Sequence, residues 1–302
     1  MKTFDELMAL SPASPFGVFS YYCDNLGDHI QTLALLQHVS ASALLPRDHL
    51  TSRPDLVLLA NGWLSCGRFP APGDFRDVRY LGVHLALERR NERDVADLAR
   101  FGTVGCRDPA TRDYLAEHGV PAVLTGCATS ALPEYHGARE GVYCVDVSDD
   151  VKEAAVRRFK DPIFLTHDLK PFHRWRYYPE EIDGAVVAAQ FRQAYEHLSR
   201  YMRADLVITS RVHVALPSAA FGTPVLYTGP PESWDDRIGI LTEAGIGRIA
   251  SPSALSTAAV AARDPHHSAF LRARFLDHLN RAVSEVARDP LAATSTRGRS
   301  PA

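Results

Sequence analysis

Residues 209–213, Thr-Ser-Arg-Val-His, combine side chains that bind anions with one that transfers protons. Arg211 presents a planar fork of donors that suits phosphate and carboxylate, and His213 exchanges protons near neutral pH. The segment, which includes Ser210, follows an apolar run and opens a run of small residues, so a helix N-terminus is expected to add free amides. These residues predict a site that holds an anion and moves a proton. A structural or solvated histidine is the alternative that residue types alone leave open.

A second polar segment, residues 24–28, reads Asp-Asn-Leu-Gly-Asp between an expected strand and an expected helix. Gly27 permits a ligand to approach the backbone closely, and the following helix offers unpaired amides to an anion. Asn25 or Asp28 can instead act as an ordinary helix N-cap, so a ligand site and a cap both stay open. The full G-x-G-x-x-G pattern is absent here, which disfavours NAD binding.

Residues 105–109, Gly-Cys-Arg-Asp-Pro, place a third candidate between the end of a strand and the start of a helix. At that position Arg107 is a natural clamp for a carboxylate or a phosphate. A local ion pair between Arg107 and Asp108 is the alternative. We expect Asp108 itself to cap the helix that begins near Pro109.

Two further segments are rich in groups that recognise sugars or anions. In residues 167–178, which contain His167, Arg174 and Arg176, aromatic side chains can stack on sugar faces and the arginines can meet an anion. A lid or an acceptor platform is one interpretation, and a solvated loop anchored by its aromatic residues is the other. Residues 229–237, Gly-Pro-Pro-Glu-Ser-Trp-Asp-Asp-Arg, form another candidate loop at a cleft.

Several well-known catalytic patterns are missing from the sequence. It holds no H-E-x-x-H, Walker A or G-x-S-x-G motif, which disfavours a metallohydrolase, a P-loop nucleotidase and an α/β-hydrolase. The five cysteines form no C-x-x-C pair and lie in apolar segments, so we expect buried thiols and neither structural zinc nor disulfides. No bound metal is predicted.

The composition is that of a soluble globular protein. The 302 residues are 46% hydrophobic and 23% charged, and the net charge of −3 indicates no basic surface for nucleic acid. The N-terminus lacks the basic and apolar pattern of a signal peptide, and no window approaches about 18 uninterrupted apolar residues. We therefore expect a cytoplasmic protein with no integral membrane segment and no nucleic-acid partner. The oligomeric state is left open.

Short apolar runs alternate with longer amphipathic ones in the first half of the chain. We expect strands at residues 16–22, 55–60, 80–85, 103–106 and 121–125, and helices at residues 29–39, 88–100 and 109–118. This β/α alternation favours a doubly wound, mostly parallel sheet.

The pattern restarts after residues 133–140, a polar stretch that we interpret as a linker. We expect strands at residues 142–147, 162–166, 204–209 and 224–227, and helices at residues 151–159, 184–202, 212–221 and 268–287. Two such sets predict an α/β protein with two Rossmann-like, doubly wound domains that face each other across a cleft. Their expected bounds are 1–136 and 137–288, the latter with a closing C-terminal helix, followed by a mobile tail at 289–302. Ligands of such sheets bind beyond the carboxyl ends of the strands.

Taken in order, these segments resemble the polysaccharide pyruvyl transferase family. The matching segments are residues 25–28 Asn-Leu-Gly-Asp, 61–63 Asn-Gly-Trp, 105–108 Gly-Cys-Arg-Asp, 125–132 Thr-Gly-Cys-Ala-Thr-Ser-Ala-Leu, 210–213 Ser-Arg-Val-His and 220–225 Ala-Phe-Gly-Thr-Pro-Val. They occur in the expected order over about residues 15–240. The Gly-Cys-Arg-Asp and Arg-x-His segments are the most specific, and Val212 stands where the family usually has leucine.

The resemblance implies a GT-B-like pair of domains and transfer of pyruvate from phosphoenolpyruvate to hydroxyls of a carbohydrate or glycosylated metabolite. The product is a ketal and phosphate is released, with no cofactor; a related enolpyruvyl transfer stays open. By motif match, Arg107 and Arg211 bind the carboxylate and phosphate of the donor, and a protonated His213 supplies the proton. The alternatives are a GT-B-type glycosyltransferase that uses a nucleotide sugar, and a non-catalytic anion-binding relative.

Overall fold

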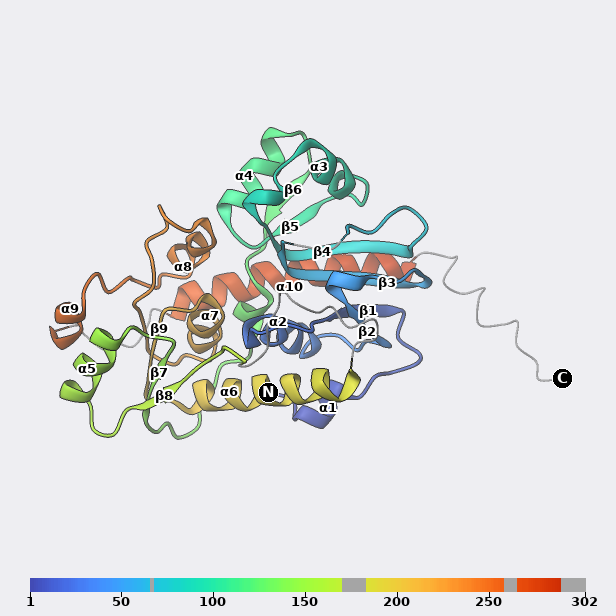
Figure 1. Cartoon of the computed structure of the whole chain (residues 1–302). Coiled ribbons are helices and arrows are strands. Elements are labelled where there is room, and N and C mark those ends of the chain that lie inside the picture. The colour runs from blue at the N-terminus through green and yellow to red at the C-terminus, as the bar shows by residue number, and fades with distance from the viewer. Residues whose placement is uncertain (66–67, 170–182, 258–264, 289–302) are drawn as a thin grey trace.

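The computed structural model describes residues 1–65, 68–169, 183–257 and 265–288 of the chain. Arg174, Arg176 and the predicted tail lie outside the described residues. Figure 1 shows two groups of strands with long helices running beside them.

Six parallel strands form the first sheet, in the order β2-β1-β3-β4-β5-β6. Both faces of this sheet are covered, because Val57 and Leu59 of β3 belong to one apolar cluster while Leu58 and Ala60 belong to another. From β1 the chain first adds β2 on one side and then β3 to β6 on the other side. Because the direction of winding reverses there, a ligand crevice is expected where β1 and β3 end. The bounds are β1 Phe16–Ser20, β2 Ala43–Pro46, β3 Arg53–Leu64, β4 Phe75–Leu85, β5 Val104–Cys106 and β6 Ala122–Leu124.

Four parallel strands form the second sheet, in the order β10-β9-β7-β8. The order reverses between β7 and β9, which places a second crevice at their carboxyl ends. The predicted α/β fold with parallel sheets is confirmed, and the domain boundary near residue 136 stays a prediction. The bounds are β7 Val142–Val145, β8 Ile163–Leu165, β9 Leu206–Thr209 and β10 Val225–Tyr227.

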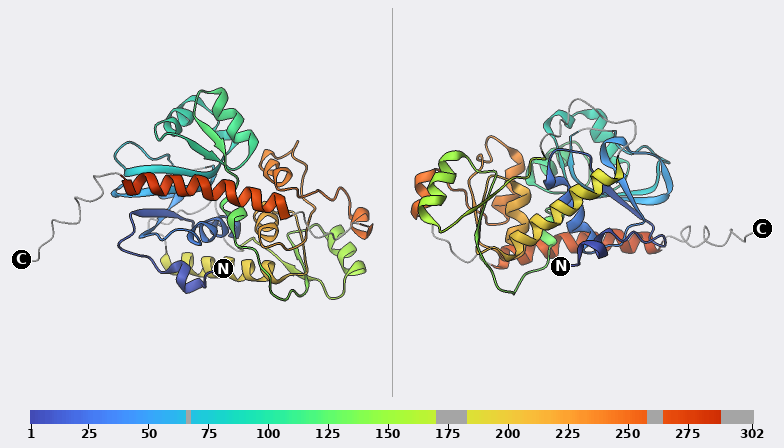
Figure 2. Two further views of the ribbon diagram at one scale, coloured as in Figure 1. Left: turned by 180° about the vertical axis from the view of Figure 1, so that it is seen from behind. Right: turned by 60° about the horizontal axis from the view of Figure 1, so that its bottom comes forward.

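Helices from the second half of the chain pack against the first sheet. The helix α6 (Gly184–Arg203) lies along α2 (Leu26–Leu36), and α10 (Pro265–Arg288) packs on β4 and on the 3-10 turn η3 (Ala128–Ala131). The apolar stripes predicted in α6 and α10 join one buried cluster with residues of β1 and β3. Figure 2 shows α10 in red running the length of this sheet, which confirms the predicted closing helix.

The remaining helices connect strands or lie at the edges of the sheets.

The short elements α1, β2, α8 and α9 were not predicted from the sequence pattern. No helix in the described part of the chain is long and apolar enough to cross a membrane. The bounds are α1 Phe4–Met8, α3 Glu92–Ala99, α4 Pro109–Glu117, α5 Asp149–Arg158, α7 Val212–Ala220, α8 Gly239–Glu243 and α9 Pro252–Thr257.

Several predicted boundaries near the candidate site are wrong, among them the start of α2, the end of β3 and the end of β1, which stops at Ser20 rather than at residue 22. The helix α2 begins at Leu26 rather than at residue 29, because the Asn25 side chain accepts a hydrogen bond from the Gly27 amide and caps the helix there. The strand β3 continues through Leu64 rather than ending at residue 60. Gly62, at a φ of +103°, lies where the pairing of β3 with β4 shifts register, a conformation that glycine adopts readily.

Candidate functional site

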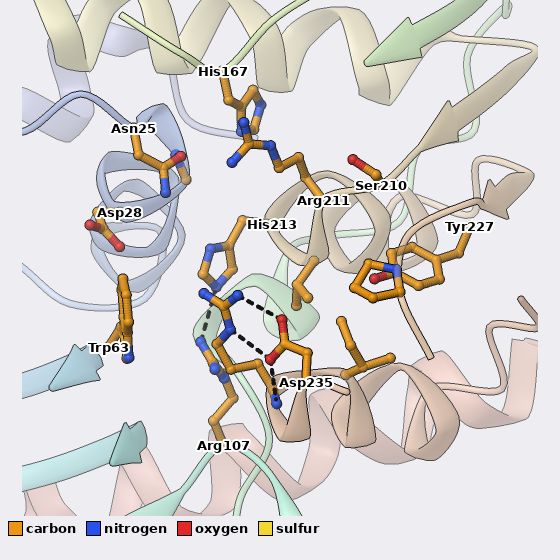
Figure 3. Close-up of a pocket in the computed structure, with 15 residues that line it drawn as sticks. Asn25, Asp28, Trp63, Arg107, His167, Ser210, Arg211, His213, Tyr227 and Asp235 are labelled. Atoms are coloured by element: carbon orange, nitrogen blue, oxygen red, sulfur yellow. Dashed lines mark hydrogen bonds and ion pairs between the residues drawn. The ribbon is translucent and has the colours of Figure 1, made fainter. Parts of the chain in front are cut away.

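One pocket of about 220 Å³ lies at the carboxyl ends of both sheets, between the two crevices (Figure 3). All the predicted site residues that the structure describes line it: Asn25, Gly27, Asp28, Arg107, His167, Ser210, Arg211 and His213. The structure therefore brings together segments from β1, β5, β8 and β9 that are far apart in the sequence. The roles assigned to these residues stay predictions.

Arg107 is the most deeply buried charged group of the pocket, with 1% of its surface exposed. Its Nη1 lies 3.4 Å from His213 Nε2, and its Nε lies 3.5 Å from an Asp108 carboxylate oxygen. Neither Nε nor Nη2 makes a hydrogen bond within the described residues. A buried cation with unused donors is costly, so Arg107 holds hydrogen-bonding capacity that the described residues do not satisfy.

Asp108 does not satisfy Arg107 because it is held by other partners. It caps α4, as predicted, by accepting a hydrogen bond of 2.9 Å from the Thr111 amide. Its second carboxylate oxygen lies 2.7 Å from His84 Nδ1. Burial alone would raise the pKa of Asp108, but the hydrogen bond from His84 and the charge of Arg107 outweigh it and lower that pKa. Sequence analysis missed His84, whose signal is a polar residue near the end of the apolar strand β4.

His213 is neutral in the ligand-free pocket. An arginine can only donate, so the contact with Arg107 requires His213 Nε2 to accept and leaves the ring proton on Nδ1. Burial, followed by the charge of Arg107, lowers the pKa of His213 well below 6.5. The protonated imidazole expected from the sequence therefore requires a bound anion that raises this pKa.

Arg211 is already engaged by two carboxylates. Its Nε donates to Asp146 at 3.0 Å and its Nη2 donates to Asp168 at 2.7 Å, with 35% of the side chain exposed. Figure 3 shows it extending toward His167, away from Arg107. Any anion that Arg211 binds must therefore share this guanidinium with Asp146 and Asp168.

Asp146 organises this side of the pocket and was missed in the sequence. It was placed inside the predicted strand 142–147, whereas β7 ends at Val145 and Asp146 adopts a φ of +50°. Besides Arg211, its carboxylate accepts hydrogen bonds from Thr166 Oγ1 at 2.6 Å and from the His167 amide at 3.0 Å. The available signal was a carboxylate directly after an apolar run, at a sheet edge where ligands bind.

The predicted cleft loop 229–237 closes the remaining side. Asp235 and Arg237 line the pocket and form a bidentate ion pair with distances of 2.8 and 2.6 Å. The Arg237 guanidinium lies 5.2 Å from the centre of the Trp63 ring, which joins this loop to β3. Tyr227 also lines the pocket; burial raises its pKa to about 12, and its hydroxyl has no partner in the described structure.

Most of these residues lie in a part of the chain that is similar to a known protein family. Residues 91–230 match the polysaccharide pyruvyl transferase family. The resemblance predicted from the sequence is confirmed over this range, which contains Arg107, Asp146, His167, Arg211 and His213. The α2 and β3 segments of the pocket precede the matched range. No curated protein matches the chain.

Solved structures show only distant likenesses. A functionally uncharacterised protein from Klebsiella pneumoniae is 14% identical, with a TM-score of 0.45 over 79% of this chain and 94% of its own. The glycotransferase of kitacinnamycin is 12% identical, with a TM-score of 0.40 over 90% and 98%. The wall teichoic acid polymerase TagF is 10% identical, with a TM-score of 0.37 over 91% and 86%. With TM-scores below 0.5, these likenesses are too distant to inform function.

Proposed function

We propose that the chain transfers the pyruvyl group of phosphoenolpyruvate to hydroxyls of a carbohydrate or glycosylated metabolite, forming a ketal and releasing phosphate. The observation that carries this proposal is the buried Arg107 guanidinium, with two unsatisfied nitrogens, in contact with the neutral imidazole of His213. A compact donor with both a phosphate and a carboxylate supplies the acceptors that Arg107 lacks. The family match over residues 91–230 supports the same reaction class.

The donor itself supplies the charge that prepares His213 for catalysis. An anion that enters between Arg107 and His213 accepts hydrogen bonds from both groups and replaces their direct contact of 3.4 Å. Its negative charge offsets the effect of Arg107 and raises the pKa of His213, so the imidazole takes up a proton. The N-terminus of α7, which no side chain caps, adds partial positive charge beside His213, whereas Arg211 is directed toward His167 and paired with Asp146 and Asp168.

The reaction then follows from these groups. His213 donates its proton to the methylene carbon of the enol phosphate, and positive charge develops on the adjacent carbon. An acceptor hydroxyl bonds to that carbon and loses its proton, and this loss is balanced by the proton that the phosphate gains when its carbon–oxygen bond breaks. Arg107 stabilises this leaving group. A second hydroxyl closes the ketal, and its proton returns to His213. We propose that the reaction needs no cofactor and takes place in the cytoplasm.

Calorimetric titration with phosphoenolpyruvate, beside a panel of nucleotide sugars, tests the donor. We expect saturable binding of phosphoenolpyruvate and no binding of the nucleotide sugars. Incubation with ¹³C-labelled donor and a panel of sugars should then yield phosphate and a quaternary ketal carbon in the NMR spectrum. Binding of a nucleotide sugar without binding of phosphoenolpyruvate would contradict the proposal and favour a glycosyltransferase.

Gly27→Ala should lower pyruvyl transfer, with the gain in helix propensity set against the crowding of His213 and of the Asn25 side chain that caps α2. An added Cβ would lie 2.9 Å from His213 Nδ1 and 3.2 Å from His213 Cβ, so the imidazole must shift. A misplacement of about 1 Å can reduce a rate about 100-fold, and we expect kcat to fall about 10- to 100-fold. Alanine also suits the first turn of α2 better than glycine does, by up to about 1 kcal/mol.

Gly184→Ala is the matched control for this variant. Gly184 also lies in the first turn of a helix, α6, and its added Cβ would meet no atom of the described residues within 4 Å. Thermal denaturation and kcat are measured for both variants. Unchanged kcat in Gly27→Ala would show that the position of His213 does not limit the reaction.

A further inference from the structure

Three buried side chains form a continuous line of hydrogen bonds that leads away from the pocket. His167 Nε2 lies 2.8 Å from the Tyr201 hydroxyl, and the same hydroxyl lies 3.0 Å from His197 Nδ1. His167 is 1% exposed, Tyr201 0% and His197 4%. The reaction steps described above use none of the three groups.

The chemistry of the shared hydroxyl restricts where the protons of this line can be. A tyrosine hydroxyl donates one hydrogen bond, so it donates to one imidazole and must accept from the other. Burial lowers the pKa of His167 well below 6.5 and that of His197 to about 4, so both rings are neutral. If Tyr201 donates to His197, both rings carry their proton on Nε2. If it donates to His167, both carry it on Nδ1.

The two ends of the line lie in different surroundings. His167 lines the pocket, and its Nδ1 has no hydrogen-bond partner in the described residues. At the other end, His197 is 4% exposed, and no hydrogen bond joins its Nε2 to the described part of the chain. The line therefore joins an unused nitrogen beside the pocket with a second imidazole whose outer nitrogen also has no partner among the described residues.

We propose that His167, Tyr201 and His197 form a proton relay between the acceptor hydroxyl and solvent, an inference that rests on the proposed function. His167 Nδ1 takes the proton of the attacking hydroxyl while its Nε2 proton passes to the oxygen of Tyr201. The Tyr201 proton moves to His197 Nδ1, and the His197 Nε2 proton leaves to water. Each group gains one proton and loses one, so no buried charge persists.

The same line runs in reverse when phosphate departs. His167 now carries a proton on Nδ1 and gives it to the leaving phosphate, while a proton from water enters at His197 Nε2. His213 protonates the methylene carbon in the first step and regains its proton from the second hydroxyl. One proton leaves and one returns through the relay in each turnover, so the relay is reset without a further reactant.

The charged groups around the line favour neutral transfer over a persistent imidazolium. Arg211 stands on the pocket side of His167, and Arg200 lies near His197 on α6; both lower the pKa values of the rings. Asp146 opposes Arg200 at His197 and raises the pKa of Tyr201 further, beyond the effect of burial. Tyr201 therefore passes a proton on as a neutral hydroxyl.

Tyr201→Phe interrupts the relay and keeps the ring that packs between α6 and the pocket. We expect kcat to fall about 10- to 100-fold and the solvent isotope effect on kcat to change, with the Kd for phosphoenolpyruvate unchanged. Tyr195→Phe is the matched control, because Tyr195 is on the same helix and its hydroxyl bonds only the Lys2 carbonyl at 3.3 Å in the described structure. Unchanged kcat and isotope effect in Tyr201→Phe would overturn the relay.

A second measurement does not depend on the activity. Nitrogen-15 NMR of the histidine rings reports their tautomers, assigned with His167→Gln and His197→Gln variants. We expect both rings in the same tautomer in the intact protein, and loss of this match in Tyr201→Phe. Opposite tautomers in the intact protein would overturn the relay even if pyruvyl transfer is found. Matched tautomers without any phosphoenolpyruvate binding would refute the proposed function and leave the hydrogen-bonded line established.

Discussion

Arg107→Met is expected to abolish the binding of phosphoenolpyruvate while the protein stays close to the wild type in stability. The guanidinium is buried, and two of its nitrogens make no hydrogen bond in the described structure. Hydrogen bonds from a charged donor to a phosphate or carboxylate contribute about 1.5–3 kcal/mol each, so loss of two or more should weaken donor binding at least about 100-fold. Calorimetric titration measures this change directly.

The stability of Arg107→Met follows from the same burial. Replacing a whole buried ion pair by apolar residues of similar volume is often neutral or stabilising by about 1–4 kcal/mol, whereas removing one partner is costly where it leaves the other charge uncompensated. Asp108 is not left alone by this substitution, because it keeps its hydrogen bonds with His84 and the Thr111 amide. The free energy of unfolding is measured by denaturant titration of both proteins.

Arg47→Met is the contrasting control, because Arg47 is equally buried and its hydrogen bonds are satisfied. It is 2% exposed, pairs with Asp48 at 2.7 Å and Asp28 at 3.5 Å, and donates to the Trp63 carbonyl at 3.0 Å. Its removal leaves the buried Asp28 carboxylate without a cation and should cost about 3–5 kcal/mol of stability. A similar loss of stability in Arg107→Met, or donor affinity retained there, would contradict the assignment of Arg107 as an anion-binding group.

His213→Gln should bind phosphoenolpyruvate within a few-fold of the wild type and turn over about 1,000-fold more slowly. The amide of glutamine fills similar space and can still accept from Arg107, but it cannot deliver a proton to carbon. General acid–base catalysis contributes about 100- to 10,000-fold to rates, which sets the expected loss. Single-turnover release of phosphate measures the chemical step, and calorimetry measures the binding.

The pH dependence of donor binding provides a second readout of His213. Without donor, the pKa of His213 lies well below 6.5 and the ring is neutral at pH 7; with donor bound, the added negative charge raises this pKa. Between the two pKa values binding takes up a proton, so donor affinity falls as pH rises, by at most about tenfold per unit. At a pH below the lower pKa of His213 or above the higher one, its titration no longer makes donor affinity depend on pH.

Titrations in buffers with different ionisation enthalpies count the protons taken up. At pH 7 we expect the wild type to take up close to one proton when it binds phosphoenolpyruvate. In His213→Gln the substituted side chain cannot take up this proton. Equal proton uptake in the two proteins would show that a group other than His213 titrates, and it would contradict the proposed role of His213.

The sequence predicted best the features that depend on neighbouring residues. Asp108 caps α4 where the pattern placed a helix start after Gly-Cys-Arg, because an N-cap needs only its own side chain and the amides that follow. The long apolar stripes of α6 and α10 were likewise predicted within a few residues. The start of α2 was placed at residue 29, three residues too late. The residue types at 24–28 suit both a loop and a helix that Asn25 caps, so the sequence did not distinguish the two.

Side-chain roles that depend on distant partners could not be derived in this way. Arg211 was predicted to bind an anion, and nothing in the sequence indicated its partners Asp146 and Asp168, which are 65 and 43 residues away in the chain. Asp146 was overlooked because no neighbouring residue shows that the backbone adopts a positive φ after the strand. Nor does the local sequence show that Arg211, Thr166 and the His167 amide converge on its carboxylate. His84 was missed for the same reason, since its partner Asp108 is 24 residues away.

The sequence by itself determined the β/α alternation, the strand ends at which polar residues gather, and the family resemblance of the segments around Arg107 and His213. These follow from hydrophobic periodicity, helix caps and short motifs, which are local properties of the chain. Only the tertiary structure decided that Arg107 and His213, 106 residues apart, are in contact and that the imidazole is neutral. It also decided that Arg107 has buried donors without partners among the described residues, while Arg211 is paired with two carboxylates. Protonation state and free hydrogen-bonding capacity depend on desolvation and on charges brought close by folding, and neither is encoded at a single position.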